Sequence, residues 1–190
     1  MFDRHLALGG KVQLTPPAEL SEPSAGDWSA WAEGASAQAQ YDTSRAISGT
    51  ASLRFTTDGG FDTAATYPGN RLAQWDLTSF QFLHVAFYAE NPNLGFQNGS
   101  PWIRLKDANG NYFQYQYYVD GNPFDILNDA RGTWRQYDIP LQASSTVENG
   151  WRRTVVGTPQ LSSIVSLEIH SDTWDYGFTL WIDAVSFTPS

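Results

Sequence analysis

The sequence contains no cysteine, so it can form no disulfide, no zinc–thiolate site and no cysteine nucleophile. Charged residues are scarce, at 16% of the 190 residues, against roughly 25% in an average globular domain. Basic residues are the scarcer kind, since 11 Lys and Arg against 20 Asp and Glu give a net charge of −9. Because nucleic acids and anionic membranes attract basic surfaces, we expect neither as a partner.

Long apolar runs are also missing. No stretch approaches the ~18 apolar residues that cross a bilayer. Residues 1–14 lack the apolar core of a secretory signal peptide. Helical periodicity is absent as well, because no segment of ten or more residues repeats its apolar positions every 3.6 residues.

Alternation of apolar and polar residues is what the sequence does contain. Short alternating segments, separated by turns rich in Gly, Pro, Asn and Asp, predict many β-strands. The predicted strands span residues 51–56, 82–88, 102–106, 112–119, 132–139, 164–170 and 178–187. Such a pattern at this length predicts an all-β fold, a two-sheet antiparallel β-sandwich of the jelly-roll type.

Proline and glycine divide the chain into two parts. Residues 1–26 include Thr15-Pro16-Pro17 and Ser21-Glu22-Pro23, which is typical of a linker or a loop that follows the domain surface. We therefore predict an N-terminal strand or linker region over residues 1–26 and a β-sandwich domain over residues 27–190.

The polar sides of these strands carry the residue types that bind sugars. If Leu83, Val85, Phe87, Ile103, Leu105, Val165, Leu167 and Ile169 face the core, the alternate residues face outward. Gln114 and Gln116 also face outward, because unpaired amides are costly in a core. The predicted ligand-binding residues are Tyr88, Trp102, Arg104, Gln114, Gln116, Glu168, His170 and, at the rim, Trp174.

Stacking and planar hydrogen bonding explain this choice. Aromatic rings can stack on the apolar face of a sugar, and Arg, Glu, Gln and His can bind its hydroxyl rim. A sheet holds such side chains at fixed spacing, so little entropy is lost on binding. The alternative is a solvated sheet face with no ligand, since exposed aromatics and cross-strand ion pairs occur on many sandwiches.

Asp183 lies among apolar residues in the last predicted strand and needs a partner. Without cysteine, an oxygen-ligand ion such as Ca²⁺ fits best. Candidate ligands are Glu22 or Glu19 and backbone carbonyls of the Ser48-Gly49-Thr50 turn. The alternative is an Asp that caps a turn or pairs with an Arg.

Four segments resemble jelly-roll carbohydrate-binding modules of bacterial polysaccharide-degrading enzymes. They are Gly26-Asp27-Trp28-Ser29-Ala30-Trp31, Ser48-Gly49-Thr50-Ala51-Ser52-Leu53-Arg54-Phe55, the stretch from Arg104 to Tyr112, and the stretch from Leu180 to Phe187. Together with residues 76–88 they span most of the chain after residue 26. Each is degenerate alone, and their order along the chain is the more specific feature.

The resemblance implies a non-catalytic module that binds a polysaccharide on its concave sheet and directs an appended catalytic domain to it. It also implies a monomer outside the cell and a structural Ca²⁺ held by Glu22, Ser48, Thr50 and Asp183. The N-terminal acidic ligand departs from the pattern, because Glu19 and Glu22 lie in a Pro-rich setting.

Two other classes of protein stay open. A small jelly-roll polysaccharide lyase or glycoside hydrolase could use Glu168 and His170, since Glu168-Ile169-His170 is similar to the Gln-Ile-His strand of jelly-roll alginate lyases. A hydrolase needs two carboxylates roughly 5–9.5 Å apart, and Glu90 is the other candidate. An anionic substrate suits a net charge of −9 poorly. The third class is a structural or adhesion sandwich without a glycan site.

Overall fold

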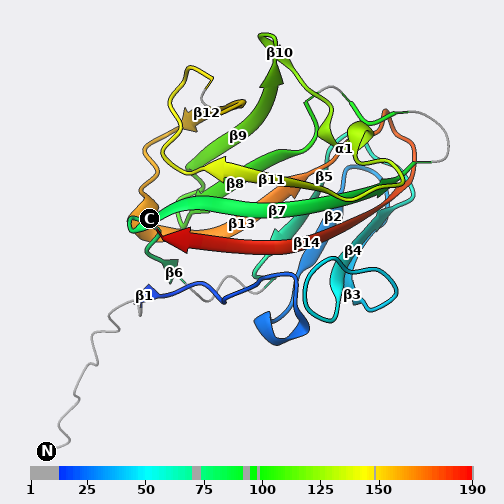
Figure 1. Ribbon diagram of the computed structural model, residues 1–190, viewed down its shortest axis with the longest axis horizontal. Coiled ribbons are helices and arrows are strands. Elements are labelled where there is room, and N and C mark those ends of the chain that lie inside the picture. The colour runs from blue at the N-terminus through cyan, green and yellow to red at the C-terminus, as the bar shows by residue number, and fades with distance from the viewer. Residues whose placement is uncertain (1–12, 70–73, 92–94, 98, 148, 190) are drawn as a thin grey trace, which may run out of the picture.

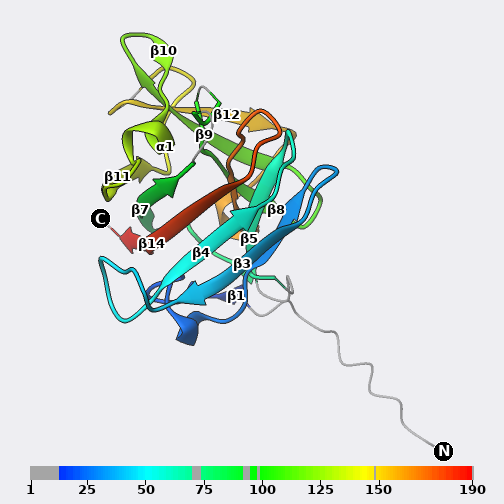
Figure 2. The same cartoon turned by 90° about the vertical axis from the view of Figure 1, so that its right-hand side faces the viewer.

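The computed structural model describes residues 13–69, 74–91, 95–97, 99–147 and 149–189, and they form two packed β-sheets (Figures 1 and 2). The nine-stranded sheet contains β1 (Gln13–Leu14), β2 (Ser29–Ala32), β5 (Thr63–Tyr67), β6 (Gln74–Trp75), β8 (Trp102–Asp107), β9 (Tyr112–Val119), β10 (Asn122–Pro123), β12 (Trp151–Val156) and β13 (Ile164–His170). The five-stranded sheet contains β3 (Ala37–Asp42), β4 (Ser52–Thr57), β7 (Phe80–Glu90), β11 (Arg135–Pro140) and β14 (Phe178–Pro189).

Strand order explains which side chains become neighbours. In the larger sheet β13 lies at the centre, with β8 then β9 then β12 on one side and β5 then β2 on the other. In the smaller sheet the order is β11-β7-β14-β4-β3, as Figure 2 shows for its last four strands. Apart from the parallel pair of β1 and β6, the strand pairs are antiparallel. The predicted all-β sandwich is confirmed.

Helical structure is limited to short turns: η1 (Pro23–Ala25), α1 (Ile126–Asp129) and η2 (Leu161–Ser163). Within the described residues, no helix has the length and apolar character that crossing a membrane requires.

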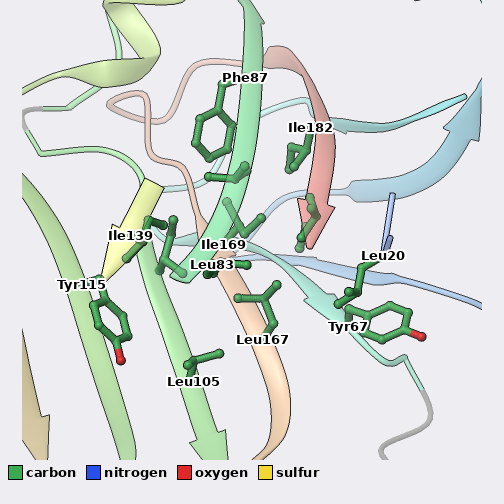
Figure 3. Packing of buried hydrophobic residues seen from close by; sticks show 14 of the residues in the cluster. Leu20, Tyr67, Leu83, Phe87, Leu105, Tyr115, Ile139, Leu167, Ile169 and Ile182 are labelled. Atoms are coloured by element: carbon green, nitrogen blue, oxygen red, sulfur yellow. The ribbon is translucent and has the colours of Figure 1, made fainter. Parts of the chain in front are cut away.

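The core lies between the two sheets, where one side of each strand meets the other layer (Figure 3). Leu105 and Leu167 come from the larger sheet, and Leu83 and Phe87 from the smaller one, and all four are almost fully buried. Replacing such a leucine by alanine costs about 2–5 kcal/mol. This packing fixes which face of each strand remains outside.

One predicted core position is wrong. The register between β13 and β8 shifts between Ile164 and Ser166, so a bulge takes up Val165. Ile164 is fully buried in its place, and Val165 is only partly buried. Beyond the bulge the alternation resumes, and Leu167 and Ile169 face the core as predicted.

The hairpin between β8 and β9 shows how local sequence sets this register. The Asp107 carboxylate accepts hydrogen bonds from the backbone N–H of Asn109 and of Asn111, at 2.8 and 2.9 Å. Gly110 has φ +84°, a conformation that glycine adopts without a Cβ clash. The turn therefore holds β8 and β9 in the pairing that places Arg104 opposite Gln114.

Residues 13–26 pack against the sandwich. Leu20 is fully buried in the core, and its N–H donates to the carbonyl of Val185 at 2.7 Å. The indole N–H of Trp28 donates to the Leu20 carbonyl at 2.8 Å. Residues 1–12 of the predicted N-terminal region lie outside the described part of the chain.

Candidate functional site: the nine-strand face

The outer face of the nine-stranded sheet, here called the nine-strand face, gathers six of the eight predicted ligand-binding residues. His170 lies opposite Trp102, and Glu168 lies opposite Arg104. Arg104 in turn lies opposite Gln114 on β9. The residues predicted from sequence that share this face are Trp102, Arg104, Gln114, Gln116, Glu168 and His170.

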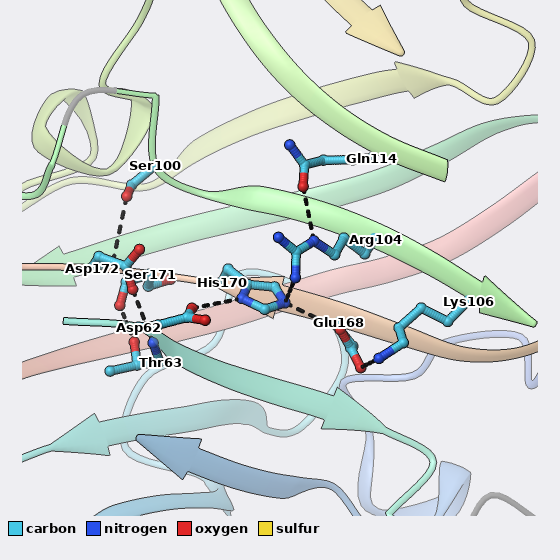
Figure 4. A network of polar contacts seen from close by, with 10 residues as sticks. All are labelled: Asp62, Thr63, Ser100, Arg104, Lys106, Gln114, Glu168, His170, Ser171 and Asp172. Carbon is cyan, nitrogen blue, oxygen red and sulfur yellow. Dashed lines mark hydrogen bonds and ion pairs between the residues drawn. The ribbon is translucent and has the colours of Figure 1, made fainter. Parts of the chain in front are cut away.

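Arg104 is at the centre of a cross-strand network (Figure 4). Its Nε donates to Gln114 Oε1 at 2.8 Å, and its Nη1 lies 3.3 Å from His170 Nε2. The guanidinium carbon lies 4.8 Å from the centre of the Tyr112 ring. These contacts hold a planar, charged donor group in one orientation, as a recognition surface requires.

His170 and Glu168 form the floor of the network, since only 4% and 5% of their surfaces are exposed. His170 Nδ1 lies 3.0 Å from Asp62 Oδ1, and its Nε2 lies 3.1 Å from Glu168 Oε2. Asp62 and Glu168 thus each lie beside one ring nitrogen of His170, and Nε2 also faces Arg104 Nη1. Because His170 and Glu168 are covered, we expect both residues to position Arg104 and Lys106 rather than to contact a ligand.

Glu168 is held in its ionised form. Burial alone would raise its pKa, but hydrogen bonds from His170 and Lys106 and the charges of those groups outweigh burial and lower the pKa to about 2. Lys106 Nζ lies 2.9 Å from Glu168 Oε1. A carboxyl group with such a low pKa is a poor general acid near neutral pH.

Trp102 and Gln116 lie beside the loop that precedes β8. Gly99 has φ +84°, and a Cβ there would lie 2.8 Å from Gln116 Nε2. The glycine thus lets the loop approach this side chain closely. The indole Nε1–H of Trp102 is buried and has no hydrogen-bond partner within the described residues. The Trp102 ring lies 6.5 Å from the His170 ring, centre to centre.

The structure corrects the predicted grouping of Tyr88. Tyr88 lies on β7, in the five-stranded sheet, and points away from the core there. Its ring packs against Trp181 and Trp134, with centres 5.8 and 5.7 Å away. Alternation had correctly predicted that Tyr88 faces outward, but it faces outward on the opposite side of the sandwich.

Exposed aromatic side chains lie near the His170 end of the face. Trp174, predicted at the rim, is 53% exposed in the turn after β13 and has φ +59°. Trp31, which sequence reasoning missed, is also 53% exposed. On β2 it lies opposite Ala64, which lies opposite His170, so Trp31 shares the face.

Carboxyl groups do not form the pair that the hydrolase interpretation considered. Glu90 is at the end of β7 in the five-stranded sheet, where it binds Arg45 at 3.1 Å, and Glu168 is on the other sheet.

Asp172 is a further acidic group near the nine-strand face. Burial raises its pKa to about 6. The hydrogen bond from the Thr63 N–H lowers the pKa, and the negative charge of Asp62 raises it.

The four predicted metal ligands lie near one loop, which spans residues 43–51. Glu22 accepts from the N–H and the hydroxyl of Thr50, at 2.6 and 2.8 Å, and these hydrogen bonds lower its pKa. Asp183 is fully buried and accepts from the N–H groups of Ile47 and Ser48, at 2.6 and 3.1 Å. A third N–H, from Ala184, donates to its other oxygen at 2.7 Å.

Ca²⁺ coordinates carboxylate and carbonyl oxygen atoms, and in this structure the carboxylates of Glu22 and Asp183 accept hydrogen bonds from N–H and O–H groups instead. Within the described residues, no group of three or more His, Asp or Glu side chains is arranged to hold a metal ion. As arranged, these residues attach the loop by hydrogen bonds. Calcium binding stays a prediction.

Known structures share this architecture. A family 11 carbohydrate-binding module from Clostridium thermocellum, solved with a β-1,3-1,4-mixed-linked tetrasaccharide, aligns over 86% of this chain and 89% of its own, with 14% identity and a TM-score of 0.51. A family 30 carbohydrate-binding module aligns over 87% and 92%, with 18% identity and a TM-score of 0.50. A β-1,2-glucanase from Parabacteroides distasonis aligns over 86% of this chain but 23% of its own, with 16% identity and a TM-score of 0.52.

No protein family profile and no curated protein sequence matches the chain. At such low identities, the structural likeness shows the fold. The resemblance stated from the sequence is thus confirmed as a shared β-sandwich fold with carbohydrate-binding modules.

Proposed function

We propose that this chain is a non-catalytic module that binds a polysaccharide along the nine-strand face. The observation that carries the proposal is the fixed cross-strand network on that face, in which Arg104 is held between Gln114 and His170 and the Trp102 ring lies beside the His170 ring. Groups held in place before binding lose little entropy on binding. The shared fold with carbohydrate-binding modules supports the same function.

The residues divide into three roles. Trp102 stacks on a sugar ring, with Trp31 and Trp174 as further aromatic surfaces near one end of the face. Arg104, Gln114 and Gln116 bind hydroxyl groups. Glu168 and His170 hold Arg104 and Lys106 in position from below. Single contacts of these kinds contribute about 1–2 kcal/mol each, so we expect weak affinity from one module.

Weak binding suits a module that works by tethering. A module fixed to a catalytic domain raises that domain's effective concentration at the polymer, so modest affinity suffices. We therefore propose that the chain acts as a monomer outside the cell and directs an appended catalytic domain to its substrate. A structural calcium ion near Asp183 remains part of the proposal as a stabilising element only.

Affinity electrophoresis tests the proposal directly. The protein is run through gels that contain soluble β-glucan, xylan, mannan or alginate, beside a gel without polymer. We expect at least one polymer to retard the wild-type protein and Trp102→Ala to abolish the retardation. Arg135→Gln, on the outer strand of the other sheet, serves as a matched control with unchanged retardation. No retardation by any polymer would contradict the proposal.

The enzymatic alternative is tested in the same samples. Release of reducing ends, or absorbance from unsaturated uronates, is measured after incubation with each polymer. We expect neither signal. A signal that Glu168→Gln or His170→Ala abolishes would overturn the non-catalytic assignment.

A further inference from the structure

Positive charge is distributed unevenly over the molecule. Most described basic side chains have a partner in the chain: Arg45, Arg54, Lys106 and Arg135 pair with carboxylates, and Arg131 and Arg153 donate to backbone carbonyls. Arg104 and Arg152 differ, because neither forms an ion pair with a carboxylate within the described residues. Both lie on the nine-strand face.

The register places these two arginines across one strand from each other. Arg104 on β8 lies opposite Gln114 of β9, and Arg152 on β12 lies opposite Gln116. With strands about 4.8 Å apart and residues about 3.4 Å apart along a strand, their Cα atoms are about 12 Å apart. Two guanidinium groups at this spacing can contact successive parts of one extended chain.

Each guanidinium is supported by an aromatic ring. The Arg152 guanidinium carbon lies 4.2 Å from the centre of the Tyr118 ring, and that of Arg104 lies 4.8 Å from the Tyr112 ring. Arg152 Nε is buried and has no hydrogen-bond partner within the described residues. Arg152 as a whole is only partly buried, so a ligand would contact its exposed atoms rather than Nε.

Positive and negative side chains occupy different parts of the nine-strand face. Arg104, Lys106 and Arg152 contribute three positive charges on β8 and β12, whereas the acidic residues Glu168, Asp62 and Asp172 lie on or beside β13 and the His170 end. The whole chain carries −9. The net charge that argued against an anionic substrate does not describe the part of this face that β8 and β12 form.

We propose that the glycan recognised on this face is anionic, and that Arg152 and Arg104 bind its carboxylate or sulfate groups. This inference rests on the proposed function and names its ligand class. Guanidinium groups form paired hydrogen bonds with planar or tetrahedral oxyanions, which neutral hydroxyl groups cannot match. The ring contacts hold both arginines in place, so these side chains lose little entropy on binding.

Polymer pairs that differ only in charge test the inference. One arm compares unsubstituted xylan with glucuronoxylan, which adds carboxylates, and the other compares agarose with a sulfated galactan. Affinity electrophoresis at low and high salt is run on the wild type, Arg152→Gln, Arg104→Gln and the control Arg135→Gln. Because the control removes the same charge from the other sheet, it corrects for net charge, and melting temperatures confirm folding.

We expect the charged member of at least one pair to bind about tenfold to a hundredfold more tightly than its neutral partner. Arg152→Gln should bring the charged polymer close to the neutral level, the control should not, and salt should weaken the difference. The arm that responds distinguishes carboxylate from sulfate.

Three results would overturn the inference. Equal binding of neutral and charged partners would refute an anionic ligand while leaving polysaccharide binding intact. A preference for the charged polymer that survives both Arg152→Gln and Arg104→Gln would place the anion site elsewhere. Binding of no polymer at all would refute the proposed function itself.

Discussion

The outer faces of the two sheets contain similar residues but arrange them differently. On the five-stranded sheet, the Arg45 guanidinium lies 3.9 Å from the centre of the Tyr88 ring and 4.5 Å from that of Trp181. Arg45 also pairs with Glu90 at 3.1 Å, and the Trp181 indole N–H donates to Asp42 at 3.1 Å. The polar groups of this five-strand face are thus bound to one another.

On the nine-strand face, by contrast, some polar groups have no partner of this kind within the described residues. Arg104 and Arg152 have no carboxylate partner, and Trp102 Nε1 has no acceptor, within the residues that the structure describes. Aromatic and planar polar side chains occur on both faces, so composition alone does not distinguish a binding surface. The distinction is whether the chain itself uses their hydrogen bonds and charges.

Replacing one tryptophan on each face should test the difference between the two faces most clearly. Trp181 is 6% exposed and packs against Tyr88, so Trp181→Ala should lower the free energy of unfolding by about 3–5 kcal/mol. Trp102→Ala should cost much less stability, yet abolish retardation by the polymer. Urea unfolding and affinity electrophoresis on both variants check this. Equal losses of stability would contradict the contrast.

The loop that carries Arg45 over the five-strand face depends on Asp183. Asp183→Ala removes the acceptor of three backbone N–H groups, so we expect a loss of about 2–4 kcal/mol in unfolding free energy. Glycan binding on the other face should persist. Urea unfolding gives the first value, and gel retardation gives the second.

The same variant tests the predicted calcium ion. If the ion is bound, a chelator lowers the melting temperature of the wild type and leaves that of Asp183→Ala unchanged. A wild-type melting temperature that chelation does not alter would contradict calcium and leave the hydrogen bonds as the attachment of the loop.

Acid should weaken the nine-strand face through Glu168. Folding lowers the pKa of Glu168 from 4.5 to about 2, so its stabilising effect is complete above pH 4.5 and is lost as the pH falls towards 2. Urea unfolding between pH 5 and pH 2.5 should show this decline, and Glu168→Gln should reduce it. An equally steep decline in Glu168→Gln would assign the effect to other carboxyl groups.

Arg45→Ala should produce the smallest change. The guanidinium rests on two rings and pairs with partly exposed Glu90, so we expect a loss of about 1 kcal/mol. Polymer binding should not change, because the five-strand face is not the proposed site. Tighter binding after Arg45→Ala would indicate that Arg45 covers a second sugar surface.

Sequence alternation predicted the nine-strand face where strands are regular. Trp102, Arg104, Gln114, Gln116 and His170 were placed correctly, because β8, β9 and β13 each alternate and pair directly with one another. Alternation states which side of its own strand a residue occupies. It does not state which sheet the strand joins, and this is why Tyr88 was assigned to the wrong surface.

Residues on short or two-sided strands could not be assigned in this way. Trp31 lies on β2, which has four residues and no clear alternation. Arg152 lies on β12, where Arg153 follows directly. Polar and apolar residues do not alternate along this strand, so its sequence does not show which side faces outward. Only the pairing of β2 with β5 and of β12 with β9 brings these residues to the face. Bulges such as the one at Val165 shift alternation without a sequence signal.

Because the eight tryptophans differ in exposure, the intrinsic fluorescence of the protein can report ligand binding. Half-exposed indoles emit at longer wavelengths than buried ones, and a sugar that covers them shifts this emission to shorter wavelengths. Trp31 and Trp174 would respond to a ligand, whereas the enclosed indoles supply a constant background that changes only on unfolding. The enclosed set is Trp28, Trp75, Trp151 and Trp181. Titration of unlabelled protein with oligosaccharide could therefore be followed by fluorescence alone.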